Sequence, residues 1–222
     1  MKQELSKEHL IKLITEITSR MNETPLIEKN HQIPVGISNR HIHLCEADIE
    51  KLFGAGYELI VQKWLKQPGQ FAAKEVVTLV GSKGSISKVR VLGPARETSQ
   101  VEISITDSIK LGVKAPIRES GDLTKAGAVT VVGPKGMVEL NKHVIVAKRH
   151  IHMHPKDART YGVSDRELVS IKTAGERGLT FDNTLIRVAE SFKLECHLDI
   201  DEANAAGLTN QSAVEIVQQE IG

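Results

Sequence analysis

Apolar and polar residues alternate in short runs along most of the chain, which predicts a protein built mainly from β-strands. Successive side chains of a strand point to opposite faces, so a strand with one buried face shows a period of two. Glycine turns separate several of these runs, and a spacing of roughly ten residues favours small barrels or sandwiches over βαβ units. We expect strands at Val76–Val80, Lys88–Leu92, Val101–Ile105, Val129–Val132, Met137–Leu140, Lys142–Ala147, Leu168–Thr173, Thr180–Val188, Glu195–Ile200 and Ala213–Val217.

A few segments break this pattern. Short helices are predicted at Cys45–Leu52, Pro155–Tyr161 and Asp201–Ala206, and residues 56–74 read as a two-stranded excursion around a Pro68-Gly69 turn. Residues 5–21 show the helical i, i+3, i+4, i+7 period of apolar residues, with charges on the other face. This N-terminal helix either docks on its own domain or presents its apolar stripe to a partner protein.

Composition narrows the class of protein. The 222 residues carry a formal net charge of +1, which argues against a nucleic-acid binder with a basic stripe. We expect no transmembrane helix and no secretory signal, because no apolar run is long enough and the N-terminus is charged. The two cysteines do not form a disulfide framework, so we expect a cytoplasmic protein with reduced thiols.

The tetrapeptide Arg-His-Ile-His occurs twice, at Arg40–His43 and at Arg149–His152. Each copy follows an apolar run that is typical of a β-strand. Residues i and i+2 of a strand share a face, so the two histidines of each copy lie side by side, about 7 Å apart. Two imidazoles on one face can chelate a divalent transition metal, and the duplication predicts two metal centres.

Each histidine pair needs a third ligand to bind a metal well while leaving a position open. Glu102 and His197 both alternate with apolar residues on predicted strands, although each alone is more often an ordinary polar residue. Cys45 shares the phase of the first pair and is a weaker candidate, more consistent with a small residue at a helix start. Cys196 points away from His197 and is expected in the core.

The turn from Gly93 to Gln100 places Arg96 among glycine, threonine and serine. An arginine in such a setting is a good reader of phosphate or an oxyanion, since its planar fork of donors acts with nearby backbone N–H groups. The alternative is an exposed hairpin tip. Arg40 and Arg149 either bind substrate anions or pair with carboxylates of the protein itself.

Three of these motifs together resemble the PduL-type phosphotransacylases, which are phosphate propanoyltransferases and their acetyl-using relatives. The motifs are Val35–Leu44, Gly93–Glu102 and Ala147–Met153, and the resemblance covers roughly residues 33–218. It implies a mainly β fold of two small β-barrel domains with short capping helices and a dinuclear zinc site between them. Barrel 1 would comprise residues 30–39 and 148–218, and barrel 2 residues 40–147 with an insertion at about 54–74.

The resemblance also implies roles for single residues. His41, His43 and Glu102 match the ligands of one zinc ion, His150, His152 and His197 match those of the other, and Arg96 matches the phosphate-binding arginine. Coenzyme A would bind near Ser38, Asn39 and Arg40. The pattern departs from the family at His154, where we expect serine or threonine, and at Ile109, where we expect an aromatic residue near the acyl pocket.

The implied reaction converts a short-chain acyl-CoA, propanoyl-CoA or acetyl-CoA, and phosphate reversibly to acyl phosphate and coenzyme A. The resemblance further implies a homo-oligomer, and a helix at residues 5–21 that resembles an encapsulation peptide for shell or core proteins of a bacterial microcompartment. Two rival hypotheses use the same ligands: a metal-dependent thioester hydrolase, and a non-catalytic metal-binding microcompartment protein. A thioester hydrolase would release coenzyme A without phosphate, whereas the transferase requires phosphate. A non-catalytic metal-binding protein would show no turnover at all.

Overall fold

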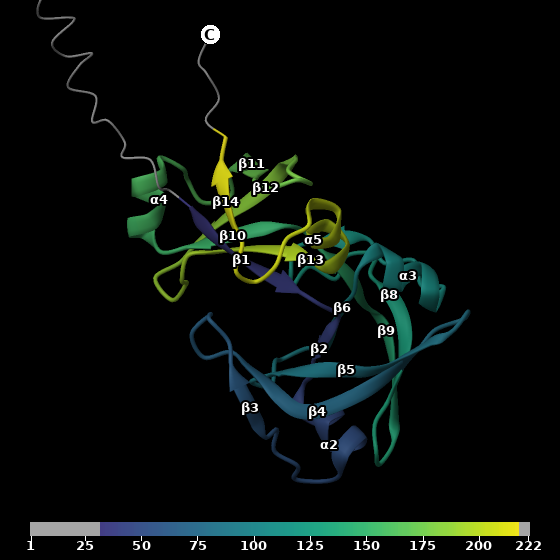
Figure 1. Cartoon of the computed structure of the whole chain (residues 1–222). Coiled ribbons are helices and arrows are strands. Elements are labelled where there is room, and N and C mark those ends of the chain that lie inside the picture. The colour runs from purple at the N-terminus through teal and green to yellow at the C-terminus, as the bar shows by residue number, and fades with distance from the viewer. Residues whose placement is uncertain (1–31, 218–222) are drawn as a thin grey trace, which may run out of the picture. The chain divides into compact units, whose positions relative to one another are not determined.

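The computed structural model describes residues 32–217, so the helix predicted at 5–21 lies outside the described residues. Within that range the chain forms fourteen strands and four short helices, in agreement with the predicted mainly β fold (Figure 1). No helix in this part of the chain has the length and apolar character needed to cross a bilayer.

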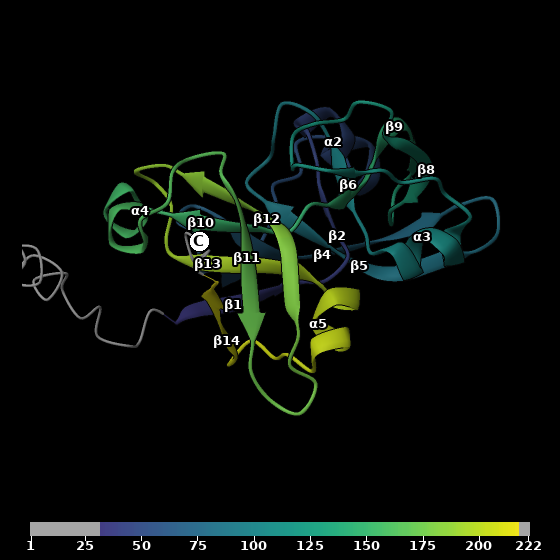
Figure 2. The same ribbon diagram turned by 90° about the horizontal axis from the view of Figure 1, so that it is seen from above.

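Six strands close barrel 1 in the order β1-β13-β10-β12-β11-β14. Their bounds are Ile33–Ser38 for β1, His150–Met153 for β10, Leu168–Thr173 for β11, Thr180–Val188 for β12, Glu195–Asp199 for β13 and Ala213–Ile216 for β14. The N-terminal strand β1 therefore completes a barrel whose other strands all come from the C-terminal part of the chain, as Figure 2 shows. Its interior is filled by branched aliphatic side chains, among them Ile33, Ile151 and Ile186.

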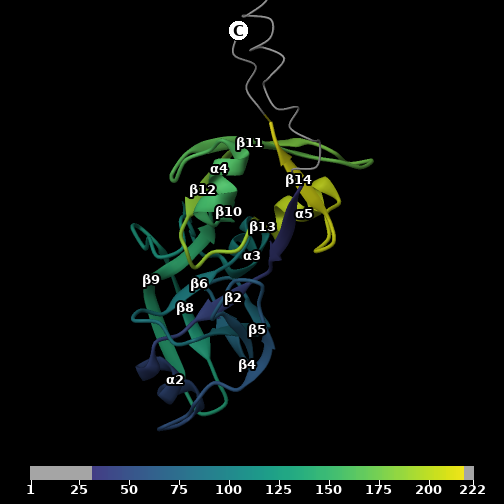
Figure 3. The ribbon, with the colours of Figure 1, turned by 90° about the vertical axis from the view of Figure 1, so that its left-hand side faces the viewer.

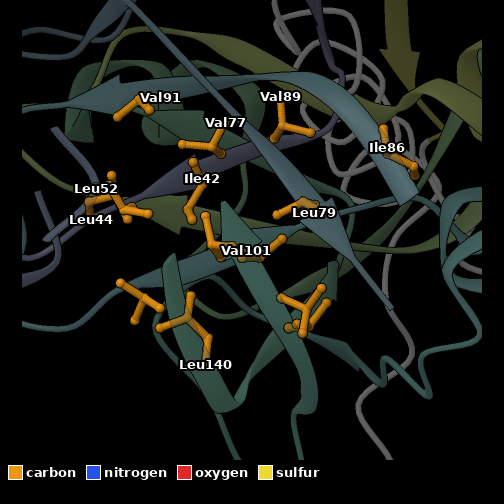
Figure 4. Close-up of a cluster of buried hydrophobic side chains, with 14 of the residues drawn as sticks. Ile42, Leu44, Leu52, Val77, Leu79, Ile86, Val89, Val91, Val101 and Leu140 are labelled. Atoms are coloured by element: carbon orange, nitrogen blue, oxygen red, sulfur yellow. The ribbon is translucent and has the colours of Figure 1, made fainter. Parts of the chain in front are cut away.

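Barrel 2 is closed because β8 pairs with both β4 and β9, which completes the ring β4-β5-β2-β6-β9-β8. The bounds of these strands are His41–His43 for β2, Phe71–Val80 for β4, Ser85–Gly93 for β5, Gln100–Glu102 for β6, Gly127–Val132 for β8 and Met137–Ala147 for β9. Two further strands attach at the rim, β3 (Val61–Trp64) on β4 and β7 (Ile117–Arg118) on β9. Figure 4 shows the core, in which Ile42, Val91 and Val101 are fully buried between the strands.

Each helix directly follows a short strand. α2 (Glu46–Phe53) follows β2, α3 (Ile105–Leu111) follows β6, α4 (Pro155–Tyr161) follows β10 and α5 (Ile200–Ala206) follows β13. Side-chain caps fix three of these helix starts, because Ser104, His154 and Asp199 each accept a hydrogen bond from a backbone N–H of the first turn. The strands before the helices consequently stop at defined residues.

The structure corrects the bounds of four predicted strands. The strand expected at Val101–Ile105 ends at Glu102, since Ser104 accepts from the N–H of Asp107 and starts α3. The strand expected at Glu195–Ile200 ends at Asp199 for the same reason. The two strands expected at 137–140 and 142–147 are one strand, β9, in which Lys142 adopts a left-handed φ of 65°.

The chain passes between the barrels at two places that have the same sequence context. It leaves β1 at Ser38 and enters β2 at His41, and it leaves β9 at Ala147 and enters β10 at His150. Each Arg-His-Ile-His copy therefore begins the strand that enters a new barrel. Both histidine pairs consequently lie where the barrels meet, and Figure 3 shows β2, β6, β10 and β13 together at this junction.

Candidate metal centre

The first histidine pair meets Glu102 across an antiparallel strand pair. In the pairing of β2 with β6, His41 lies directly opposite Glu102. One ligand atom from each of His41, His43 and Glu102 lies within 4.8 Å of the others, and all three residues are buried. The distance from Nε2 of His41 to Oε2 of Glu102 is 3.4 Å. We name these three residues cluster A.

The second pair meets His197 in the same way. In the pairing of β10 with β13, His150 lies directly opposite His197. Ligand atoms of His150, His152 and His197 again lie within 4.8 Å of one another, and His197 is the most exposed of the three. We name these residues cluster B. The structure thus brings together both predicted triads, each from two strands that are far apart in sequence.

Each cluster has a supporting residue that forms a hydrogen bond with one of its three members. Gln100 lies opposite His43 and donates to Oε1 of Glu102 at 2.6 Å. Glu195 lies opposite His152 and contacts Nε2 of His197 at 2.8 Å. Sequence reasoning missed both supporting residues, although each stands two residues before a predicted ligand and therefore on the same face of its strand.

In three of the cluster histidines, a hydrogen bond to an oxygen that can only accept shows which ring nitrogen carries the proton. The other ring nitrogen is then free to bind a metal. Nδ1 of His41 lies 2.8 Å from the carbonyl of Asn39, and Nδ1 of His150 lies 2.8 Å from the carbonyl of Lys148. A carbonyl only accepts, so Nδ1 carries the proton in both rings and Nε2 keeps its lone pair. His197 has the opposite tautomer, because its Nε2 donates to the Glu195 carboxylate and Nδ1 is left as the ligand atom.

Several buried ring nitrogens have no protein partner. Among the described residues, Nδ1 of His43 and both ring nitrogens of His152 make no hydrogen bond. Buried polar atoms are nearly always satisfied, so these nitrogens require a partner that is not a protein atom. The donor sets, two imidazoles with a carboxylate and three imidazoles, are those that a divalent transition metal accepts. The clusters therefore fit metal ions.

The protonation states also suit metal binding. Burial lowers the pKa of His150 to about 4 and that of His152 to about 2, so both rings are neutral near pH 7. Burial alone would raise the pKa of Glu102, but the facing rings of His41 and His43 and the charge of Arg96 bring it down to about 2. Neutral imidazole and ionised carboxylate are the forms that coordinate metals.

Arg96 lies beside cluster A instead of at an exposed hairpin tip. Its backbone N–H donates to the carbonyl of Leu44 at 2.9 Å, and its Nη1 lies 3.3 Å from the hydroxyl of Ser120. Burial lowers the pKa of the half-buried guanidinium, which has no carboxylate within ion-pair distance among residues 32–217. The structure thus places an arginine with unused donors next to a candidate metal site.

Comparisons with known proteins decide the family. The family model for phosphate propanoyltransferase matches residues 34–209. The chain belongs to the phosphate propanoyltransferase family. A phosphate propanoyltransferase of Thermotoga maritima is 56% identical over 194 residues, covering 87% of this chain and 92% of that protein. Proteins with the same name are 48% identical in Clostridioides difficile, over 95% of this chain and 98% of that protein, and 51% identical in Priestia megaterium, over 90% and 92%.

In this phosphate propanoyltransferase, the arginines of the two repeated motifs pair with carboxylates of the protein. Nε of Arg40 lies 2.7 Å from Asp107 in α3, and Nε of Arg149 lies 2.7 Å from Glu202 in α5. The sequence left two roles open for Arg40 and Arg149, and the structure shows that they form ion pairs with carboxylates of the protein. Each arginine ties the histidine strand to the helix that follows the third cluster residue.

The remaining candidates lie outside both clusters. Cys45 is the N-cap residue of α2, and its sulfur lies 3.5 Å from the hydroxyl of Ser99, which donates to Asp48 at 2.6 Å. Cys196 is fully buried in the core of barrel 1, as expected. His154 caps α4 and contacts Glu190 through Nε2 at 2.8 Å. Ser38 and Asn39, predicted near coenzyme A, line a small cavity at the junction together with Glu102 and Asp199.

Proposed function

We propose that this phosphate propanoyltransferase works with two zinc ions, one in each cluster, and reversibly converts propanoyl-CoA or acetyl-CoA and phosphate to acyl phosphate and coenzyme A. One observation supports this proposal most strongly. Clusters A and B, which could each hold a metal ion, lie at the same junction as Arg96, which has no carboxylate partner. A thioester and a phosphate dianion need these two kinds of group, a Lewis acid and an anion binder.

Three protein ligands in each cluster suit a catalytic rather than a structural zinc ion, which would have four. When bound, zinc supplies Lewis-acid polarisation of the thioester carbonyl and stabilises the departing thiolate. The protein contributes the fixed ring orientations through Asn39, Lys148 and Glu195, which hold the donor nitrogens toward the centre of each cluster. Cobalt or iron would fit the same donors, so the identity of the metal is part of the proposal.

Arg96 has the role of binding and orienting the phosphate. Its planar guanidinium can hold two phosphate oxygens at once, which orients another oxygen for attack and lowers the entropic cost of the encounter. A phosphate oxygen then attacks the thioester carbonyl carbon. The new C–O bond forms, the C–S bond breaks, and coenzyme A leaves as the thiolate.

An acyl-enzyme intermediate has little support. Burial raises the pKa of the Cys196 thiol, which keeps it protonated inside the core of barrel 1. Cys45 is the N-cap residue of α2, where its backbone N–H donates to the hydroxyl of Ser99, and it lies outside both clusters. Direct transfer between coenzyme A and phosphate therefore agrees better with the residues near the clusters.

Several finer predictions remain proposals. We assign residues 30–39 with 148–218 to one domain and 40–147 to the other, in line with the strand order of the two barrels. The junction cavity at Ser38 and Asn39 is the proposed approach for coenzyme A. The homo-oligomeric state, the cytoplasmic or microcompartment location and the targeting role of residues 5–21 are proposed on the family resemblance alone.

The test is a CoA-release assay with acetyl-, propanoyl- and butanoyl-CoA, each with and without phosphate, together with metal analysis of the same sample. The proposal predicts release that requires phosphate and yields acyl phosphate. Release of equal rate without phosphate would instead support the thioester hydrolase. Bound metal with no turnover of any of these substrates would support the non-catalytic metal-binding protein.

A further inference from the structure

Arg187 lies next to cluster B, although neither histidine motif points to it. In the parallel pairing of β10 with β12, Arg187 is the direct neighbour of His152. The preceding residue, Ile186, is fully buried in the core of barrel 1. Because side chains alternate along a strand, Arg187 projects from the outer face of the barrel, the face that carries His152.

An aromatic ring links the guanidinium of Arg187 to the cluster. Its Cζ atom lies 5.6 Å from the ring centroid of Phe192, and the ring of Phe192 stacks on that of His152 with centroids 4.1 Å apart. A guanidinium over an aromatic face is weakly stabilised and loses part of its freedom to move. The stack therefore holds a positive charge beside cluster B.

Within residues 32–217, Arg187 has no carboxylate at ion-pair distance, and this separates it from most arginines near the junction. Arg40 and Arg149 each pair with a carboxylate at 2.7 Å. Arg96 likewise has no carboxylate at ion-pair distance, whereas Arg90, opposite His41, donates to the backbone carbonyls of Ala73 and Lys74. Arg96 and Arg187 thus keep guanidinium donors that the protein does not use.

The two unpaired arginines come from different barrels and feel each other's charge. Burial lowers the pKa of Arg96, the charge of Glu102 opposes this, and the charge of Arg187 lowers the pKa further. Arg187 also lowers the pKa of His150 and His152. Two cations held near one another repel even with Glu102 close to one of them, and a further anion between them reduces that repulsion.

We propose that Arg187 is a second phosphoryl-binding residue, which acts with Arg96 so that the reacting phosphate is held from both barrels at once. The proposal rests on the proposed transferase function and deepens it. The same chemistry recurs in the phosphates of coenzyme A, but the place of Arg187 directly beside His152 of cluster B favours the reacting phosphoryl group. An arginine from each barrel would also bind phosphate only when the junction is correctly formed.

The experiment compares Arg187→Ala and Arg187→Lys with wild type and with Arg159→Ala, a matched control on the exposed side of α4. Steady-state assays give separate KM values for phosphate and for propanoyl-CoA, and metal content is measured on each protein. Inorganic phosphate alone is also titrated against thermal unfolding, which needs no turnover. Wild-type turnover with phosphate tests the transferase function, and the variants test the inference.

We expect the KM for phosphate to rise about tenfold or more in Arg187→Ala, as for the loss of a charged hydrogen bond, with a smaller rise in Arg187→Lys. Stabilisation by phosphate should shrink in parallel, while metal content and the KM for propanoyl-CoA stay at the wild-type value. Arg159→Ala should match wild type in every assay.

Three results would overturn the inference. A rise confined to the KM for propanoyl-CoA would place Arg187 on the phosphates of coenzyme A. A loss of metal would make it a support for His152. Unchanged phosphate binding would remove any role for it in the site. Should Arg187→Ala fail to fold, Arg187→Lys and Arg187→Gln decide between the same results.

Discussion

Nε2 of His197 lies 2.8 Å from the carboxylate of Glu195, and this contact fixes the tautomer that cluster B needs. Burial would raise the pKa of Glu195, but the bond from His197 and the contacts of Lys66 and Gln67 bring it to about 2. The carboxylate is therefore ionised and can only accept. In cluster A the equivalent supporting residue is Gln100, which donates a hydrogen bond to Glu102.

Glu195→Gln should weaken metal binding in cluster B by about 10- to 100-fold, because it removes the charge that orients and polarises His197. Cluster A should keep its affinity. Chelator competition monitored by metal release should therefore become biphasic. Glu190→Gln, which changes an exposed glutamate beside His154, is the control. Equal weakening of both metals would contradict this role of Glu195.

The hairpin of β3 and β4 reaches the other barrel through one buried side chain. Nε2 of Gln67 donates to the carbonyl of Lys193 at 3.0 Å, and Oε1 of Gln67 accepts from the N–H of Lys193 at 3.2 Å. Gln67→Ala leaves both backbone groups unpaired and should lower the free energy of unfolding by about 1–3 kcal/mol. Denaturant unfolding against Gln62→Ala, an exposed position on β3, measures the difference. Equal free energies of unfolding for the two variants would show that the contact between Gln67 and Lys193 does not stabilise the protein.

Arg96→Ala should raise the KM for phosphate about tenfold or more, since a charged hydrogen bond to the substrate is lost. The metal content should not change, because Arg96 is not among the residues of either cluster. Steady-state kinetics with varied phosphate and metal analysis of the same preparation check both parts. Loss of metal from this variant would refute the assigned role.

Deletion of residues 1–25 should leave the transferase activity intact, since both clusters and Arg96 lie in residues 32–217. If the segment is an encapsulation peptide, the shortened protein should no longer enter a microcompartment. The measurement is specific activity of the purified protein together with co-purification of the full and shortened chains with shells. An inactive or unfolded shortened protein would favour a helix that docks on its own domain.

The sequence alone predicts those residues of the site that are placed by the alternation of side chains along a strand. His41 and His43 share a face because they stand two residues apart, and Glu102 and His197 could be proposed because each alternates with apolar neighbours. Helix α3 was missed, although the spacing of Ser104 and Asp107 is a capping signal that could have revealed it.

Other parts depend on which distant segments meet, and no local pattern encodes that. Arg187 reaches His152 only through the parallel pairing of β10 with β12. Gln67 reaches Lys193 across 126 residues of sequence. Parallel pairing and contacts between barrels leave no short-range period in the chain, so these residues emerge only from the folded structure.

The central claim is that each cluster independently holds one metal ion. Native mass spectrometry with metal analysis of the intact protein tests it most directly, on wild type, His43→Ala and His152→Ala. The account predicts two metal ions per chain in wild type and one in each variant, with the other cluster still filled. A wild-type protein that binds fewer than two ions per chain, or a folded variant that retains both, would contradict it.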